Sequence, residues 1–400
     1  MRSDNNDGVI ALSYSFDELI DRKNSRSYKW DQVGPLFGDK DILPLWVADM
    51  DFPSPPAVRE VLHKRVELGA YGYAIRTDDY FDAIMGWFQR RHHWKLEKDW
   101  IVDSPSVVTT LSLAVEQFTA PGDKVVIQTP VYYPFYDVIE SNDRVLALNP
   151  LINQNGRYEM DLEQLESLFS EGAKLMLFCN PHNPGGRVWS RDELLALGDL
   201  CLRYGVTVVS DEIHCDLIFP GHEHVPFASL SEELAAITIT CLAATKTFNL
   251  PGLHTSFMVV QNSGMRARLD KRIKTLSIHM AQHFAQDAVV AAYNEGEVWL
   301  EDLLVYVKGN LDYALAYLEE HLPQVKPMKP DGTYLLWLDC RALGLDKNGL
   351  KQLMHKKAKV AFNEGSMFGV EGEGWLRVNL ACPRFIVEQA LRQFCEAAKQ

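Results

Sequence analysis

The stretch AATKTFNLPGL, residues 243–253, places Lys246 four residues after the end of an apolar, β-branched run. That run, ITITCL at 237–242, is typical of a buried strand. An ammonium group buried at the end of a strand is costly unless it is paired or neutralised. A lysine that condenses with an aldehyde loses its charge and becomes an electrophilic imine. Since an isolated lysine more often reaches solvent from a loop, this interpretation depends on the motifs around it.

Apolar segments alternate with amphipathic helices on both sides of this stretch. Runs of this length call for an α/β fold with a mainly parallel sheet covered by helices on both faces. In such sheets the functional residues gather at the carboxyl ends of the strands. The strands are expected at 123–128, 174–179, 206–210, 237–242 and 256–260. One helix is expected from a Ser106 cap to Pro121-Gly122, and another from a capping box of Ser190 and Glu193 to Gly205.

The two ends of the chain have a different character. Residues 41–53, DILPLWVADMDFP, predict an extended arm, whereas 56–68 and 79–91 have helical spacing. Towards the C-terminus we expect helices at 297–321 and 384–399 and strands at 333–338 and 359–362. The predicted organisation is an N-terminal arm (1–55) that completes a smaller α+β domain (291–400), and a large α/β domain (56–290).

Composition excludes several classes of protein. The formal charge is −14, which argues against nucleic-acid binding and against anionic membrane surfaces. No apolar run approaches the length of a membrane span, and the polar N-terminus MRSDNNDGVIALSYSF is unlike a signal peptide. The seven cysteines form no C-x-x-C pair and are typical of reduced core residues. A cytoplasmic protein is therefore predicted.

Two polar motifs follow predicted strands. The turn NPHNPGGRV at 180–188 leaves the side-chain amide of Asn183 free to donate. The motif DEIHCD at 211–216 places Asp211 at a strand end, where it either caps a turn or pairs with a buried cation such as a protonated pyridine nitrogen. Either motif alone is more often structural.

Taken together, the three motifs resemble a known family. Asn183 in N-P-x-N-P-x-G, Asp211 in D-E-I-H and Lys246 in T-K-T-F-N-x-P-G are similar, in order and spacing, to the fold-type I pyridoxal-phosphate (PLP) enzymes of the class I/II aminotransferase family. The resemblance covers about residues 40–395 and implies a mainly parallel sheet of the seven-stranded type, covered by helices, with a smaller α+β domain. The motifs D-E-I-H, K-T-F-N and LPLWVADMDF (43–52) are similar to those of the cystathionine β-lyase, or carbon–sulfur lyase, branch of that family.

The resemblance implies roles for individual residues around the ring of PLP. Lys246 would hold the cofactor covalently, Asp211 would pair with the pyridine nitrogen, and Asn183 would contact the phenolic oxygen and lie beside the substrate. Tyr132 would stack on the ring, although a half-buried core tyrosine is the alternative. Arg377 in GWLRVNL would clamp the substrate carboxylate, a bidentate geometry that lysine does not reproduce.

The phosphate of PLP needs its own donors. The amides of Val107, Val108 and Thr109 open the helix that Ser106 caps, where the helix dipole favours an anion. The Thr245 hydroxyl lies next to the lysine, and in relatives the counterpart of Tyr73 reaches across a dimer interface to the phosphate, which implies a homodimer.

Three positions depart from the family pattern, because Ala243, His254 and His214 stand where many relatives carry Ser, Arg and Tyr. His214 would still lie beside the phenolic oxygen. Residues 46–49, with Val47 and Ala48 at their centre, would run past the substrate carboxylate unless this arm only packs.

The activity implied by the branch is PLP-dependent β-elimination on amino acids with sulfur on the β-carbon, which gives a thiol, pyruvate and ammonia. A PLP-dependent aminotransferase is the alternative, because it uses the same residues up to removal of the α-proton. A regulatory or binding protein on the same fold is the third hypothesis. The histidines at 92–93 and 222–224 lack further ligands at suitable spacing, so solvated loops and no metal site are predicted.

Overall fold

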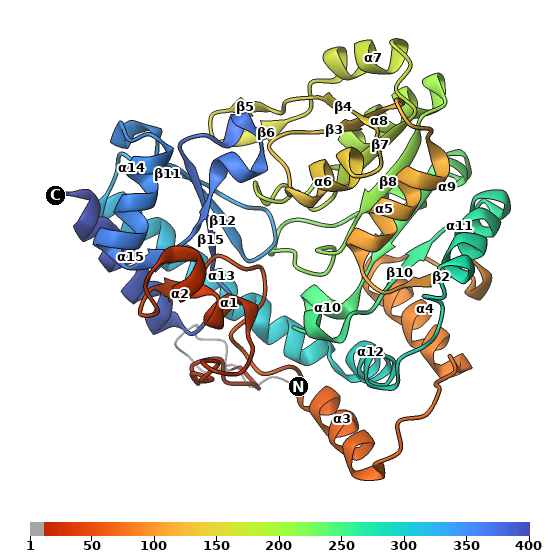
Figure 1. Cartoon of the computed structure of the whole chain (residues 1–400), viewed down its shortest axis with the longest axis horizontal. Coiled ribbons are helices and arrows are strands. Elements are labelled where there is room, and N and C mark those ends of the chain that lie inside the picture. Colours follow the sequence, from red (N-terminus) through yellow and green to blue (C-terminus); the bar gives the residue numbers. More distant parts are fainter. Residues whose placement is uncertain (1–11) are drawn as a thin grey trace.

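A seven-stranded sheet forms the centre of the structure, a computed structural model that describes residues 12–400 (Figure 1). The strand order is β2-β10-β9-β8-β7-β3-β4, and only β10 runs antiparallel to its neighbours. The strands are β2 (Ile101–Ser104), β3 (Lys124–Ile127), β4 (Val145–Leu148), β7 (Leu175–Cys179), β8 (Thr207–Asp211), β9 (Thr238–Leu242) and β10 (Ser256–Val259). The mainly parallel α/β sheet predicted from the sequence is confirmed.

Helices cover both faces of this sheet because its strands are apolar on both sides. In β7, Leu175 and Leu177 pack with α5 (Val107–Phe118), α6 (Pro134–Glu140) and α11 (Ser263–Thr275). Met176 and Phe178 point the other way and pack with α7 (Leu162–Ser170), α8 (Arg191–Tyr204) and α9 (Glu232–Ile237). Successive residues of a strand face opposite sides, so one apolar run supplies two cores.

Capping residues set the ends of the helices near the sheet. The Ser106 hydroxyl accepts a hydrogen bond from the amide of Thr109 at the start of α5. Ser190 and Glu193 form a capping box at the start of α8, and Gly205 ends that helix in the left-handed region with φ of 66°. These caps were predicted, whereas Ile237 was wrongly placed in the strand and closes α9 instead.

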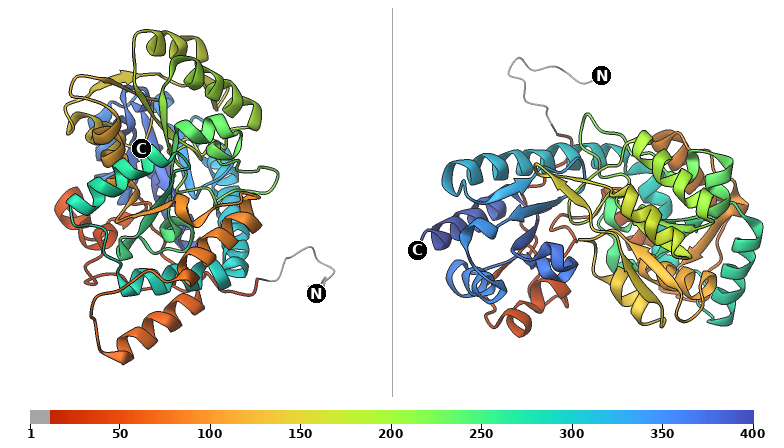
Figure 2. Two further views of the ribbon diagram at one scale, coloured as in Figure 1. Left: turned by 90° about the vertical axis from the view of Figure 1, so that its right-hand side faces the viewer. Right: turned by 90° about the horizontal axis from the view of Figure 1, so that it is seen from above.

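A second, antiparallel sheet lies beside the first and appears in blue in Figure 1. It has the order β11-β12-β15-β14, formed by β11 (Lys326–Met328), β12 (Leu335–Asp339), β15 (Trp375–Asn379) and β14 (Asn363–Glu364). The long helix α13 (Glu297–His321) and the final helix α15 (Arg384–Ala398) pack against each other. Figure 2 shows α13 running from this part of the molecule towards the large sheet.

The N-terminal arm joins this smaller part. Strand β1 (Leu43–Pro44) pairs in parallel with β13 (Val360–Ala361), so the expected extended arm adds to the C-terminal region. The remaining α-helices are α1 (Tyr28–Asp31), α2 (Val33–Phe37), α3 (Pro56–Leu68), α4 (Asp78–His92), α10 (Ala244–Thr247), α12 (His283–Glu295) and α14 (Lys347–Gln352), and β5 (Ile152–Gln154) forms a hairpin with β6 (Arg157–Glu159).

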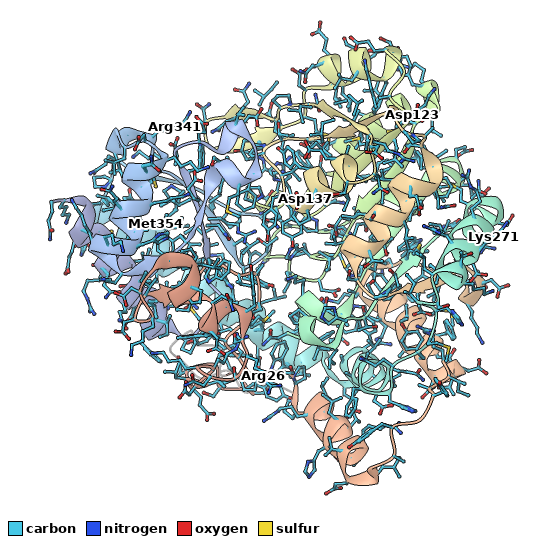
Figure 3. All side chains as sticks on the ribbon, in the orientation of Figure 1. Arg26, Asp123, Asp137, Lys271, Arg341 and Met354 are labelled. Atoms are coloured by element: carbon cyan, nitrogen blue, oxygen red, sulfur yellow. The ribbon has the colours of Figure 1, made fainter. Side chains whose placement is uncertain are left out.

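The predicted domain boundaries at 55/56 and 290/291 stay predictions. The large sheet is built from residues between 101 and 259, and the small sheet from residues between 326 and 379, on either side of the second boundary. The first eleven residues of the predicted arm lie outside the described residues. Charged side chains such as Lys271 and Arg341 lie at the periphery, as Figure 3 shows.

Within residues 12–400, no helix is both long enough and apolar enough to cross a membrane. All seven cysteines are buried and unpaired in this described part of the chain.

Candidate active site

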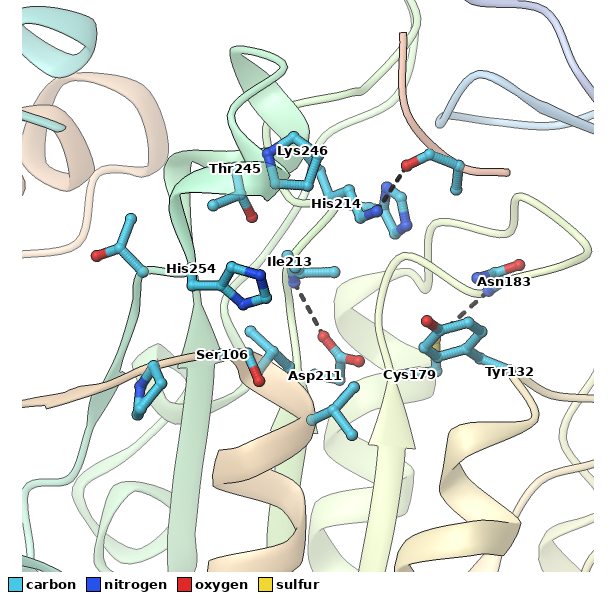
Figure 4. Close-up of a pocket in the computed structure, with 16 residues that line it drawn as sticks. Ser106, Tyr132, Cys179, Asn183, Asp211, Ile213, His214, Thr245, Lys246 and His254 are labelled. Atoms are coloured by element: carbon cyan, nitrogen blue, oxygen red, sulfur yellow. Dashed lines mark hydrogen bonds between the residues drawn. The ribbon is translucent and has the colours of Figure 1, made fainter. Parts of the chain in front are cut away.

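A cavity of about 190 Å³ lies where β7, β8 and β9 end (Figure 4). Cys179 and Asp211, the last residues of β7 and β8, line it, and so does Lys246 from the short helix after β9. The carboxyl ends of these parallel strands share one edge of the sheet. The three motifs, far apart in the sequence, therefore meet at one cavity.

Lys246 lies on α10 directly after β9, and its Nζ donates a hydrogen bond of 2.6 Å to the carbonyl oxygen of Ala48. Burial lowers the pKa of this amine to about 8. A substantial fraction of the amine is therefore neutral, and nucleophilic, near physiological pH.

Asp211 lies across the cavity from Lys246 in Figure 4. It is 5% exposed and accepts a hydrogen bond of 3.2 Å from the amide of Ile213. Burial raises the pKa of its carboxyl group to about 7. A cation placed against this carboxylate would lower that pKa and relieve the cost of burying the charge.

Arg377 is a buried cation held only by neutral groups. It is 3% exposed, and its Nη1 donates to Asn183 Oδ1 over 2.9 Å. Its Nη2 donates to the carbonyl of Trp46 over 3.0 Å and to Asn363 Oδ1 over 2.5 Å. Nε has no hydrogen-bond partner among residues 12–400. Burial lowers the pKa of the guanidinium to about 10, so this site favours an anionic ligand.

His214 and Tyr132 complete the walls of the cavity. His214 is 4% exposed, and burial lowers the pKa of its imidazole to about 3, so the ring is neutral. Its Nδ1 is buried without a partner in the described part of the chain. Tyr132 donates its amide to the carbonyl of Asn183 over 3.1 Å, and both residues line the cavity (Figure 4).

The other end of the cavity is suited to an anion. Val107 and Val108 line it from the first turn of α5, where backbone amides have no acceptor within the helix. Figure 4 shows Ser106, Thr245 and His254 gathered there, away from Asn183 and Tyr132. The cavity is therefore polar at both ends, and its residue types fit a ring with a nitrogen, a phenolic oxygen and a phosphate.

The model of the family "Aminotransferase class I and II" matches residues 40–394. The chain belongs to the class I and II aminotransferase family. The chain is 47% identical to one curated member, cystathionine beta-lyase PatB of Bacillus subtilis, over 380 residues. The match covers 95% of this chain and 98% of PatB.

Solved structures of aminotransferase-family proteins agree with this assignment. A PLP-bound putative aminotransferase from Clostridium difficile 630 has a TM-score of 0.95 and 44% identity, over 96% of this chain and 100% of that one. The PLP-bound C-S lyase from Staphylococcus hominis has a TM-score of 0.91 and 32% identity, over 98% of this chain and 99% of that one. The predicted resemblance to fold-type I PLP enzymes, cystathionine β-lyase branch, is confirmed.

Most of the site residues predicted for this aminotransferase-family chain line the cavity or contact a residue that does. Ala48 and Thr245 line it, whereas Val47 instead accepts a hydrogen bond of 2.6 Å from Asn379 Nδ2 through its carbonyl. Thr109 differs from Val107 and Val108, because its amide already donates to the Ser106 hydroxyl over 3.1 Å. Tyr73 lies outside the cavity and is 93% exposed.

The prediction of solvated histidine loops is wrong for His92 and His224. The side chain of His92 is 4% exposed and its Nε2 lies 2.7 Å from Asp216 Oδ1. His224 Nε2 lies 2.8 Å from Glu212 Oε2, and both groups are buried. Two buried acids, Asp216 and Glu212, occupy the hydrogen-bond positions that water was expected to occupy. His93 and His222 are exposed as predicted.

Potential metal-ligand atoms of His92, Cys215 and Asp216 lie within 4.8 Å of one another, a grouping that sequence spacing did not indicate. The Asp216 carboxylate already accepts hydrogen bonds from Trp87 Nε1 over 3.0 Å and Thr247 Oγ1 over 2.7 Å. The contacts therefore form a buried hydrogen-bond network beside α10.

Sequence reasoning missed Asn363 and Tyr334. Asn363 Oδ1 accepts from Arg377, and the Tyr334 hydroxyl donates to the carbonyl of Ala48 over 3.0 Å. Neither residue lies in a motif that follows a strand of the large sheet. The only signal for Tyr334 was its position after the turn sequence Asp331-Gly332.

Proposed function

We propose that this chain binds PLP through Lys246 and catalyses β-elimination on amino acids that carry sulfur on the β-carbon. The observation that carries the proposal is the pairing, at one site, of a half-buried amine with a lowered pKa and a buried guanidinium without an anionic partner among the described residues. PatB is named a cystathionine beta-lyase and the S. hominis protein a C-S lyase, and both names favour elimination.

The residues present fit PLP. Asp211 would pair with the pyridine nitrogen, and the Asn183 amide with His214 would contact the phenolic oxygen, because Asn183 Oδ1 is already bound to Arg377. Tyr132 would lie against the ring. When bound, PLP withdraws electrons from the bond that breaks at the α-carbon of the substrate.

The phosphate end uses other groups. The amides of Val107 and Val108 and the hydroxyl of Thr245 would bind the phosphate. Tyr73 of a second copy would add its hydroxyl. This assignment leaves the amide of Thr109 in its capping role.

The chain's own residues would perform the substrate chemistry in two ways. Arg377 would bind the α-carboxylate, which supplies the missing anion and orients the α-carbon. Lys246, released as a neutral amine, would remove the α-proton. Loss of a thiolate from the β-carbon and reaction with one water would then give a thiol, pyruvate and ammonia.

Transamination remains the second candidate function, because it begins with the same proton removal and the similar C. difficile protein is named a putative aminotransferase. A purely regulatory or binding role is disfavoured. Such a role gives no reason to keep the buried Asp211 and Arg377 and the half-buried Lys246 close together at one site at a cost in stability.

We also propose a cytoplasmic homodimer. Five exposed apolar side chains lie at the C-terminal end of α3 and in the segment after it, namely Val66, Leu68, Tyr71, Tyr73 and Ile75. A second copy that covered them would bury this patch and bring Tyr73 to the neighbouring cavity. The seven unpaired cysteines support a reducing compartment.

The experiment is a product assay. Purified protein with PLP is incubated with cystathionine, and free thiol and pyruvate are measured, with Lys246→Ala as the inactive control. A parallel reaction with an amino acid and a keto-acid acceptor measures transamination. Equal amounts of thiol and pyruvate support elimination, amino-group transfer alone supports the second candidate, and neither product contradicts both.

A further inference from the structure

The carbonyl oxygen of Ala48 accepts hydrogen bonds from two side chains that approach it from different parts of the chain. Lys246 Nζ lies 2.6 Å away and the Tyr334 hydroxyl 3.0 Å away. A backbone carbonyl has two lone pairs, so it accepts both donors at once. The amine and the phenol therefore compete for the electron density of one oxygen.

The backbone around Tyr334 is held firmly in place. The preceding residue, Thr333, has φ of 68°, a conformation that is costly for a β-branched side chain and persists only where the surroundings enforce it. The amide of Thr333 donates to the carbonyl of Leu217 over 2.5 Å, and that of Gly332 donates to the carbonyl of Gly186 over 3.1 Å. These contacts tie the turn to the loops after β8 and β7, which also carry the site residues.

Charged groups from three elements face Lys246. Asp49 from the arm and Asp211 from β8 favour its ammonium form, whereas Arg377 from β15 disfavours it together with burial. Tyr334 is 2% exposed, and burial raises the pKa of its phenol, so the hydroxyl stays protonated and remains a donor. Its ring lies edge-on to that of His214, with centroids 6.0 Å apart.

We propose that Tyr334 is a positioning residue that acts on Lys246 through the shared carbonyl of Ala48. By occupying one lone pair, the phenol weakens the carbonyl as an acceptor for the amine. A weaker acceptor destabilises the charged ammonium form of Lys246 more than the neutral amine, because the ammonium makes the stronger hydrogen bond to the Ala48 carbonyl. Tyr334 thus keeps Lys246 available as a base. The inference rests on the proposed function, in which Lys246 reacts as a neutral amine.

The test uses the cofactor-free full-length protein, because the reaction of Lys246 with PLP reports the neutral amine without any turnover. The rate of the absorbance change on adding PLP is measured from pH 6 to 10 for wild type and Tyr334→Phe. We expect the midpoint of this pH profile to rise in the variant. At pH 7 the rate should fall roughly three- to tenfold, with the high-pH plateau unchanged.

Tyr158→Phe is the matched control. The Tyr158 hydroxyl accepts a hydrogen bond of 3.1 Å from Trp337 Nε1, and the residue is buried outside the cavity. Its loss removes a buried hydrogen bond of similar length without touching Lys246, so the wild-type pH midpoint should remain. Replacing Tyr334 with 3,5-difluorotyrosine, a stronger donor, should lower the midpoint instead.

The outcomes separate this inference from the proposed function. A Tyr334→Phe profile that coincides with wild type, or a midpoint that shifts equally in Tyr158→Phe, overturns the role of Tyr334 alone. A wild-type protein that shows no reaction with PLP at any pH overturns the proposed function as well. Thermal melting of each variant confirms that the folded protein is being compared.

Discussion

Asn183 Oδ1 accepts a hydrogen bond of 2.9 Å from Arg377 Nη1, which joins the turn after β7 to strand β15 of the smaller sheet. The contact fixes the orientation of the Asn183 amide, because its oxygen is occupied and its nitrogen is left to face the cavity. It also leaves the positive charge of Arg377 uncompensated, since an amide oxygen carries no net charge. Arg377, proposed to bind the substrate carboxylate, and Asn183, proposed to contact the cofactor, are therefore coupled through one hydrogen bond.

Replacing Asn183 by Asp tests this coupling. The new carboxylate would pair with Arg377 and compete with the carboxylate of the substrate. We expect KM to rise roughly 10- to 100-fold, equivalent to about 1.4–2.7 kcal/mol of lost binding. Steady-state kinetics check this, with Asn262→Asp at the N-cap of α11, outside the cavity, as the control. An unchanged KM would show that Arg377 does not bind the substrate carboxylate.

Asp211→Asn should stabilise the cofactor-free protein while abolishing activity. The folded-state pKa of Asp211, about 7, lies above the unfolded value of 3.8, so the folded protein binds the extra proton between these values. Stability is therefore lost as pH rises through this window. We expect the Tm of the variant to exceed that of wild type at pH 8 and to match it more closely at pH 5.

Asp137→Asn, at an exposed position of α6, is the control for this comparison and should show no such pH-dependent gain. A cofactor-free Asp211→Asn protein that melts below wild type at pH 8 would contradict the view that the Asp211 carboxylate lacks a cation.

The reaction of wild-type protein with PLP should depend on pH through Lys246. Its folded-state pKa is lowered to about 8, so the rate should rise about tenfold per pH unit below that value and level off above it. Stopped-flow absorbance measures the profile. A midpoint near 10.5, the ordinary value for lysine, would mean that the amine is solvated, against the burial described above.

Lys29→Met should destabilise the protein and loosen the arm that carries Ala48. Lys29 is 1% exposed, and its Nζ lies 2.6 Å from Asp51 Oδ2, which is equally buried. Removing one partner leaves a buried charge, with Arg22 as its remaining ion-pair partner. We expect a loss of roughly 3 kcal/mol in the free energy of unfolding.

Urea denaturation measures this effect. Lys64→Met breaks the exposed i,i+4 pair with Glu60 on α3 and should leave the midpoint close to wild type. Equal effects of the two substitutions would show that the buried pair contributes no more than a surface one.

The sequence predicted those parts of the site that lie in short motifs directly after strands. Lys246, Asp211 and Asn183 could be placed because the carboxyl ends of parallel strands meet at one edge. The contact of Asn363 with Arg377 and the contact of Tyr334 with Ala48 could not. The first is a cross-strand pair of β14 and β15, and the second depends on a backbone carbonyl of the arm; neither leaves a periodic signal. His92 and His224 were misplaced for the same reason, since their acidic partners lie 124 and 12 residues away.

The covalent link between Lys246 and PLP is the central claim, and reduction with borohydride tests it most directly. The protein is incubated with PLP, reduced, digested and analysed by mass spectrometry. We predict that the peptide containing residues 243–253 gains the mass of a reduced phosphopyridoxyl group on Lys246. An unmodified Lys246, or a modification found only on exposed lysines such as Lys64, would contradict the account.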